Sequence, residues 1–146
     1  MDPSKLRKKL LAEAPPGALV YGHMVPDVLR KGEVEFVAVL RCEPSELKRR
    51  LEARRYPGEK ITENVEAELI GVVLDESIRV FGAKAVREYD TTGRTPDSVA
   101  RSIARDYRRR ASKSAKKPFI DWTIRYDSST KLRSLLSPPS TEPAST

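Results

Sequence analysis

The sequence holds few of the residues that build disulfides, metal centres and labile surfaces. Its 146 residues include one cysteine, Cys42, one histidine, His23, and one asparagine, Asn64, and glutamine is absent. One cysteine excludes a disulfide framework, and one histidine leaves little for a His/Cys metal site. No apolar run approaches the roughly 18–20 residues of a membrane span, and the first residues are not typical of a signal peptide. The scarcity of amides beside abundant Glu, Lys and Arg favours a thermophile-like protein of a reducing cytoplasm.

The sequence also lacks the common catalytic patterns. Neither G-x-x-x-x-G-K-[ST] nor G-x-G-x-x-G occurs in it, so it contains no recognisable phosphate loop. A nucleophilic Ser/His/Asp or Cys/His arrangement finds no support with one His and one Cys. We interpret Cys42, at the end of a predicted buried strand, as a structural residue.

Charge is distributed unevenly along the chain. The net charge is +7, but residues 1–100 hold 17 Lys/Arg against 17 Asp/Glu, whereas residues 101–133 hold 11 against 3. The basic character therefore belongs to the C-terminal part. Two interpretations stay open, a solvated arm or an RNA-contacting arm driven by counterion release from phosphates. The residues of such an arm are Arg108, Arg109, Arg110, Lys113, Lys116 and Lys117.

Hydrophobic patterning predicts alternating helices and strands. Strands are expected at 18–21, 35–42 and 85–90, and helices from about 3 to 14, 45 to 54, 60 to 81 and 96 to 110. This order predicts an α/β fold with a parallel sheet. Three strands are few for such a sheet, which suggests that part of a larger one is missing. The apolar island 119–124 is expected to dock on the domain, and the Pro/Ser/Thr-rich residues 137–146 are expected to be disordered.

A group of arginines stands out at the end of the predicted helix 45–54. Arg49, Arg50, Arg54 and Arg55 precede a break at residues 56–60. Arg50 and Arg54 are four residues apart, so they share one helical face. Guanidinium groups at such a junction can clamp phosphate oxygens. The alternative is a solvated face, whose carboxylate partners would be Glu46, Glu52 and Glu59.

These residues lie within motifs that resemble a known family. The motifs are L-R-C-E-P at 40–44, L-x-x-R-L-x-x-R-x-Y at 47–56, K-I-x-E-N-V-E-A-E at 60–68, D-T-T-G-R-T-P at 90–96 and I-D-W at 120–122. Over residues 2–125 the sequence resembles the atypical adenylate kinases of archaea and the eukaryotic nucleus, the isoenzyme-six type, also described as ribosome-maturation ATPases.

The resemblance implies a partial P-loop nucleoside-monophosphate-kinase fold. This is a three-layer α/β fold with a parallel sheet, whose N-terminal strands and P-loop would be absent here. We accordingly expect a truncated domain at 1–110 with a lid at about 53–63, a basic extension at 111–136 and a tail at 137–146. Met1 would then be an internal methionine taken as a start, or the gene would be truncated or split.

The resemblance also implies roles for individual residues. Arg54 matches the lid arginine that contacts the ATP phosphates, and Arg50 is similar to a second family arginine. Arg55 departs from the family, which usually has glycine there, and this leaves lid closure open. His23 matches a Walker-B-like region, although Tyr21 stands where many members have aspartate, and a purely structural role for His23 remains the alternative. The loop expected near the adenine ring comprises Thr92, Gly93, Arg94 and Thr95.

Three functions follow as expectations. The first is the family activity, ATP and AMP giving two ADP, with Mg-ATP as the implied cofactor. Without a Walker A motif, this chain alone is expected to be inactive and to hold neither the cofactor nor a metal directly. The second is a non-catalytic role in small-ribosomal-subunit maturation, with a ribosomal protein as partner and rRNA bound through the basic tail. The third is the inactive product of a mis-assigned start codon. A cytoplasmic location without a membrane partner fits all three.

Overall fold

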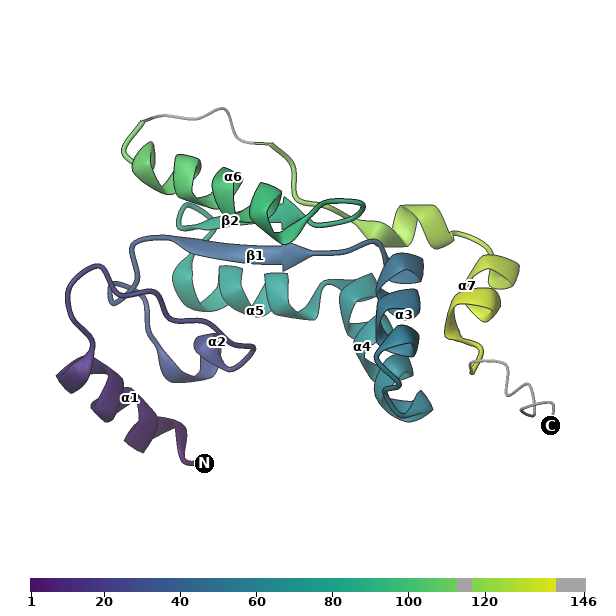
Figure 1. The fold of residues 1–146 in the computed structure, drawn as a ribbon, viewed down its shortest axis with the longest axis horizontal. Helices are drawn as coiled ribbons and strands as arrows, with labels where there is room; N and C mark the ends of the chain where they lie inside the picture. The colour runs from purple at the N-terminus through teal and green to yellow at the C-terminus, as the bar shows by residue number, and fades with distance from the viewer. Residues whose placement is uncertain (113–116, 139–146) are drawn as a thin grey trace. The chain divides into compact units, whose positions relative to one another are not determined.

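The computed structural model describes residues 1–112 and 117–138 of the chain (Figure 1). In order, its elements are α1 (Pro3–Glu13), α2 (Val25–Val28), β1 (Val37–Arg41), α3 (Pro44–Ala53), α4 (Gly58–Ile70), α5 (Val72–Phe81), β2 (Val86–Asp90), α6 (Pro96–Arg108), the 3-10 helix η1 (Trp122–Tyr126) and α7 (Ser129–Leu136). None of the helices within these residues combines the length and the apolarity that a bilayer crossing requires.

The two strands form a parallel pair. Near the start of the pair, the Val37 N–H group donates to the Ala85 carbonyl at 2.9 Å, and past its end the Thr91 N–H group donates to the Arg41 carbonyl at 2.7 Å. From the first of these bonds to the second, the residue numbers increase along both strands, so the strands are parallel. Helices α3, α4 and α5 form the crossover between them (Figure 1). The predicted α/β class with a parallel sheet is confirmed.

The predicted strand at 18–21 is wrong. This segment forms no strand, and the side chains of Leu19 and Tyr21 are exposed, whereas Val20 packs against apolar neighbours. An apolar run becomes a strand only when a neighbouring strand takes its backbone hydrogen bonds. Among the described residues β1 pairs with β2 alone.

The predicted helix over 60–81 is two helices in the structure. α4 ends at Ile70 and α5 begins at Val72, because Gly71 between them adopts a left-handed conformation with φ of 75°. The apolar side chains recur at helical spacing on both sides of this break, so their periodicity alone could not reveal the break. Glycine is the residue that takes such a φ without steric cost. The short helix α2 lies between α1 and β1.

Two compact units can be distinguished, each with its own core. The described residues of one unit lie within Met1–Val39 and Val73–Arg87. Those of the other lie within Leu40–Val72 and Glu88–Thr146. The buried core of the first unit consists of Val28, Leu29, Val39, Leu74, Phe81 and Val86. The buried core of the second consists of Leu51, Ile61, Val65, Leu69, Trp122 and Leu135.

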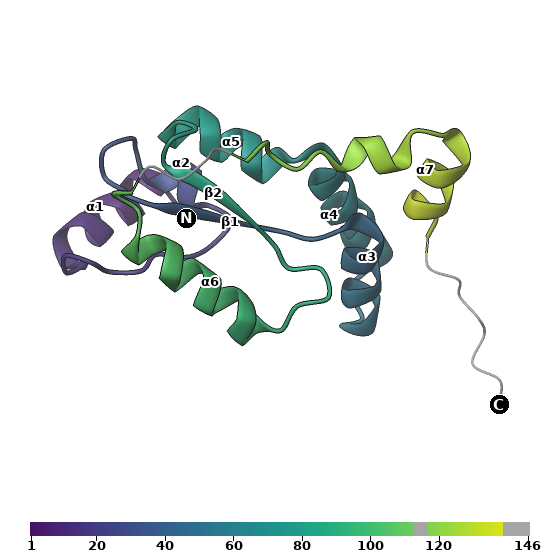
Figure 2. The ribbon, with the colours of Figure 1, turned by 90° about the horizontal axis from the view of Figure 1, so that it is seen from above.

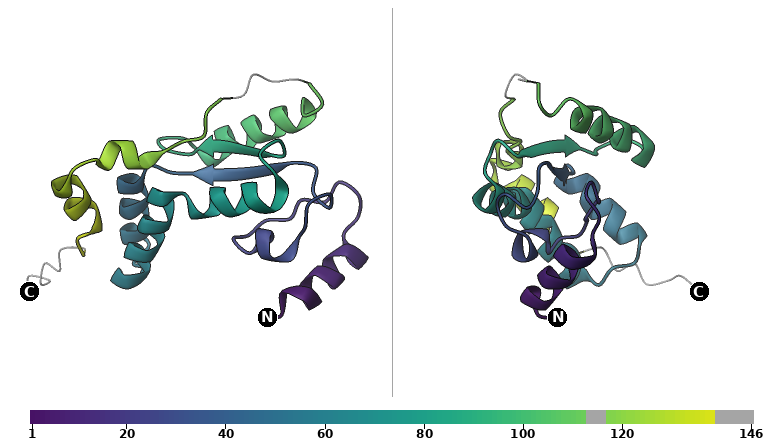
Figure 3. Two further views of the ribbon diagram at one scale, coloured as in Figure 1. Left: turned by 180° about the vertical axis from the view of Figure 1, so that it is seen from behind. Right: turned by 90° about the vertical axis from the view of Figure 1, so that its left-hand side faces the viewer.

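In the second unit, α3 and α4 lie side by side (Figures 1 and 3). η1 and α7 pack against α4, and α7 also contacts α3 (Figure 2). Trp122 of η1 is 2% exposed and Leu135 of α7 is 5% exposed. The predicted docking of 119–124 is therefore confirmed for Ile120 and Trp122, whereas Phe119 and Ile124 stay exposed. Of the segment predicted to be disordered, residues 139–146 lie outside the described part of the chain.

Candidate functional site

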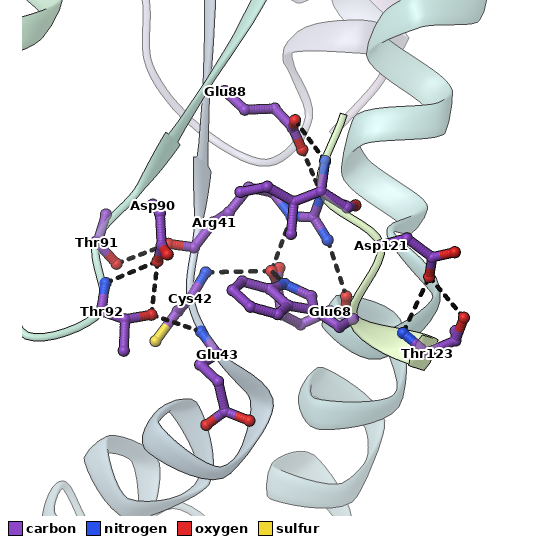
Figure 4. Close-up of polar contacts among 12 residues, drawn as sticks. Arg41, Cys42, Glu43, Glu68, Glu88, Asp90, Thr91, Thr92, Asp121 and Thr123 are labelled. Carbon is purple, nitrogen blue, oxygen red and sulfur yellow. Dashed lines mark hydrogen bonds and ion pairs between the residues drawn. The ribbon is translucent and has the colours of Figure 1, made fainter. Parts of the chain in front are cut away.

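The candidate site lies where the parallel strands end in unit 2. Ligands of α/β folds bind at the carboxyl ends of the strands, because the loops there carry the variable side chains. β1 is followed by Cys42 and Glu43, and β2 by the loop that begins at Thr91. The Glu43 N–H group donates to the Thr92 hydroxyl at 2.8 Å, and this hydroxyl donates to the Asp90 carboxylate at 2.6 Å (Figure 4). The two loops are therefore fixed to each other.

Arg50 extends from α3 to the second of these loops. Its Nη1 group donates to the Thr91 hydroxyl at 3.2 Å, and its Nη2 group to the Thr91 carbonyl at 3.0 Å. Its Nε group donates to Glu46 at 3.1 Å. All of these bonds are made to the protein itself, so Arg50 acts in this state as a positioning residue for the loop after β2. The expectation that it contacts phosphate stays a prediction.

Arg54 stands apart from the other arginines of α3. Arg49 and Arg50 both pair with Glu46, in line with the solvated-face interpretation for those two residues. Arg54 is the exposed C-cap residue of α3, and within the described residues its side chain pairs with no carboxylate. Its guanidinium therefore belongs to the turn that joins α3 to α4 and has no anionic partner there.

The turn after Arg54 is short and sharply bent. α4 begins at Gly58, so the non-helical connection spans only residues 54–57. Arg55 has a φ of 57°, and its N–H group bonds to the Glu52 carbonyl at 2.9 Å. A non-glycine residue rarely adopts this conformation. The backbone at 55 thus has the left-handed geometry that glycine favours, although the residue is arginine.

The loop expected near an adenine ring is also well ordered by its own contacts. Arg94 turns onto α6 and donates to the Ser98 carbonyl at 2.9 Å and to the Ser102 hydroxyl at 2.7 Å. Thr95 is the N-cap of α6 and accepts from the Ser98 N–H group at 3.2 Å. Gly93 has a φ of 66°. These contacts hold the loop in one shape and leave the guanidinium of Arg94 engaged.

His23 belongs to the other unit, where it lies exposed in a turn before α2, and no strand precedes it. A Walker-B-like position requires a side chain at the end of a buried strand, so this part of the resemblance lacks its structural context. Among the described residues, no group of three His, Cys, Asp or Glu side chains is placed to hold a metal ion. The expectation that Arg54 contacts the phosphates of Mg-ATP stays a prediction.

Cys42 and Tyr126 line the start of α3. Burial is the main cause that raises the pKa of the Cys42 thiol, which agrees with a structural residue. The Tyr126 hydroxyl donates to Glu43, whose carboxylate also accepts the N–H groups of Ser45 and Glu46 at 3.1 Å each. Burial and this bond raise the pKa of Tyr126. The η1 segment thus supports the residue that caps α3.

A buried ion cluster below the site was not predicted from the sequence. Arg41 is 2% exposed, and it pairs with Glu68 at 2.8 Å and with Glu88 at 2.5 Å (Figure 4). The indole N–H group of Trp122 donates to Glu68 at 2.8 Å, and the Ile120 N–H group to Glu88 at 2.9 Å. The sequence signal that could have indicated this cluster was an arginine inside the most apolar predicted strand. A charge buried there requires partners of opposite charge.

The basic residues beyond α6 are exposed where the structure describes them. Arg108 ends α6, Arg109 is its C-cap, and Lys117 is exposed. The Arg110 guanidinium lies over the Tyr107 ring, 4.0 Å from its centroid. The other two members of the predicted RNA-contacting arm, Lys113 and Lys116, lie outside the described residues.

Sequence comparisons show which proteins this chain resembles. Residues 5–71 match the family described as AAA domain. A protein of Halobacterium salinarum named "Putative adenylate kinase" is 45% identical over 74 residues, which are 51% of this chain and 44% of that protein. Proteins of the same name from Thermococcus kodakarensis and Thermococcus onnurineus are 39% and 35% identical over 65% and 72% of this chain. The matched parts are 51% and 52% of those relatives.

These matches support an atypical adenylate-kinase-like family for this chain. It spans about half the length of the curated relatives it matches.

Proposed function

We propose that this chain carries the ATP-phosphate-binding arginine of an adenylate-kinase-like phosphotransferase or ATPase. The observation that carries the proposal is the position of Arg54, exposed at the α3–α4 turn without a carboxylate partner among the described residues. Arg49 and Arg50 are held by Glu46 and Thr91, so their guanidinium groups are already engaged. The family relationship to proteins named as adenylate kinases supports the same role.

The chemistry asked of Arg54 is electrostatic. A phosphoryl group in transfer carries negative charge on its equatorial oxygens, and an arginine that contacts them lowers the barrier. Arg54 would bind two of these oxygens through its planar fork. Arg50 would act indirectly, because it holds Thr91 and with it the loop proposed to face the adenine ring.

These 146 residues contain no Walker A sequence. Within residues 1–112 and 117–138, no group of three His, Cys, Asp or Glu side chains is placed to hold a metal ion. Mg²⁺ bound to ATP would neutralise phosphate charge when it is present. By themselves the 146 residues are therefore proposed to bind ATP weakly through Arg54 and to form no ADP from ATP and AMP.

A binding experiment tests the role of Arg54. We expect titration calorimetry to detect weak ATP binding, weaker binding of AMP, and at least a tenfold loss of ATP affinity in Arg54→Ala, since a charge-assisted bond to phosphate is lost. Arg49→Ala is the matched control, because Arg49 is 74% exposed in the same helix but pairs with Glu46. Equal losses in both variants would contradict a specific role for Arg54.

The activity of the chain is tested separately. A coupled assay with ATP, AMP and Mg²⁺ is expected to give no ADP above background from the 146 residues. ADP formation that Arg54→Ala abolishes would show that these residues suffice for catalysis. It would overturn the proposed inactivity and strengthen the phosphate-binding proposal.

A second candidate is a binding role in maturation of the small ribosomal subunit, through a ribosomal protein and rRNA. The observation that favours it is the basic C-terminal region, with 11 Lys/Arg against 3 Asp/Glu in residues 101–133. Phosphate backbones attract such a region through counterion release. This candidate requires no catalysis, so it is compatible with an inactive chain.

A further inference from the structure

Helix α6 carries a straight row of arginines on its exposed side. Arg101, Arg105 and Arg108 recur at intervals of four and three residues, and all three are exposed. At about 100° per residue they fall within roughly 60° of one another around the helix. The 1.5 Å rise per residue separates them by about 6 and 4.5 Å along the axis. We refer to these three residues as the α6 arginine row.

The opposite side of α6 fixes the direction in which this row faces. Val99 is buried, and Asp106 accepts a hydrogen bond from the Tyr89 hydroxyl at 2.9 Å. Arg94 holds the first turns through Ser98 and Ser102. The Tyr89–Asp106 bond thus fixes the second half of α6 to β2, and the bonds from Arg94 hold its first turns.

The two acidic residues near the α6 arginine row do not neutralise its charge. Asp97 is one turn before Arg101, in the first turn of α6, where the helix dipole favours a negative charge. Asp106 is next to Arg105 and accepts from its Nε group at 3.3 Å. That contact uses Nε and not the two terminal amino groups, which are the fork that binds phosphate oxygens. Arg108 and Arg109 continue the positive charge past the end of the helix.

We propose that the α6 arginine row is a docking surface for the phosphate backbone of a nucleic acid. The inference rests on the binding role proposed above for the basic C-terminal region, and it moves the centre of that role from the segment after α6 onto α6 itself. Arginine suits this ligand because its planar fork matches phosphate oxygens. The row offers no set of groups for base edges, so recognition is by backbone and independent of sequence.

Fluorescence anisotropy with labelled nucleic acids at several salt concentrations tests the proposal. The probes are an RNA duplex, a single-stranded RNA, a DNA duplex and a poly-glutamate peptide. For the preferred nucleic acid, we expect Arg101→Gln/Arg105→Gln/Arg108→Gln to lose at least tenfold in affinity, and the slope of log affinity against log salt to fall by about 2–3. The corresponding triple lysine variant should retain most of the affinity, because it keeps the charges.

Two controls separate this surface from net charge and from the segment after α6. Lys9→Gln/Arg79→Gln/Lys84→Gln removes the same charge from exposed residues of the other unit and should leave binding nearly unchanged. Arg109→Gln/Arg110→Gln/Lys117→Gln removes the charge just after α6. Circular dichroism of every variant checks that it is folded.

Four results would overturn the proposal. If the triple control in the other unit loses as much affinity, net charge explains the binding. If only the triple beyond α6 loses affinity, the nucleic-acid role survives and the α6 row does not carry it. If poly-glutamate binds as tightly as nucleic acid, the surface belongs to an acidic protein. If no nucleic acid binds the parent chain, the row and the nucleic-acid role fail together.

Discussion

Arg41 shows how a single residue can link distant segments of this chain. Its side chain donates four hydrogen bonds, to the carboxylates of Glu68 and Glu88 and to the carbonyls of Glu68 and Ile120. The cluster brings one cation together with two carboxylates, and backbone and indole N–H groups donate to the same two carboxylates. Buried charges persist only when they are paired in this way.

Loss of Arg41 should therefore be costly. We expect Arg41→Ala to lower the free energy of unfolding by about 3–5 kcal/mol, because two mostly buried carboxylates lose their cation. Urea unfolding followed by far-ultraviolet circular dichroism measures this change. Arg54→Ala is the control, since surface substitutions typically change stability by no more than about 0.5 kcal/mol. A change of that size for Arg41→Ala would contradict a structural role for the cluster.

At the scale of elements, Gly71 decides where α4 stops. The apolar stripe of α4 continues into α5, and the left-handed backbone at Gly71 is what separates the two helices. A Cβ atom there would lie 3.6 Å from Arg41 Nη2, an ordinary contact, so space is not the restriction. The restriction is the φ of 75°, which strains any other L-residue.

Gly71→Ala is accordingly expected to destabilise the protein by about 1–2 kcal/mol. Gly58→Ala is the matched control, because Gly58 begins α4 without a positive φ and alanine favours helices. Thermal unfolding of both variants measures the difference. If Gly58→Ala and Gly71→Ala have the same midpoint, the break between α4 and α5 does not depend on the backbone of Gly71.

Capping residues and apolar runs in the sequence predicted some helices and strands well and failed for others. Pro44 and Thr95 mark the starts of α3 and α6, and the apolar run before Cys42 marks β1, so these elements were predicted to within two or three residues. The segment at 18–21 has the same local signals, but a strand also needs a neighbour, and neighbours are not encoded locally.

The candidate site shows the same division. Arg54 and Arg50 were found from their spacing and from the resemblance. The engagement of Arg50 with Thr91 joins residues 41 positions apart, and the pairing of Arg41 with Glu88 joins residues 47 positions apart. Only the folded chain brings such pairs together, so no local pattern could have assigned Arg50 its positioning contact or Arg41 its partners.

For the molecule as a whole, the C-terminal part changes the meaning of the basic region. Trp122 and Leu135 lie in the same core as Leu51, Ile61 and Val65. Charge alone described residues 101–133 as an arm, yet part of this region completes a hydrophobic core. A deletion that removes the charges also removes that core, so substitutions are the appropriate test of nucleic-acid binding.

A chain that ends at Lys117 should expose the apolar faces of α3 and α4. We expect it to bind a hydrophobic dye and to aggregate, because buried leucine, isoleucine and valine side chains lose their cover. Dye binding and light scattering measure both effects. Asp127→Ala/Lys131→Ala, which removes an exposed ion pair of the same region, should behave like the parent chain. A soluble, dye-negative shortened chain would contradict this prediction.

Trp122 is the single tryptophan of the sequence, and it lies in the core of only one of the two units. Its intrinsic fluorescence is therefore a local optical probe that responds when unit 2 loosens and is insensitive to melting confined to the other unit. Circular dichroism at the helix band averages over both. If tryptophan fluorescence and circular dichroism change at different denaturant concentrations or temperatures, the two units unfold in separate transitions. If the two curves superimpose, the units unfold in a single transition.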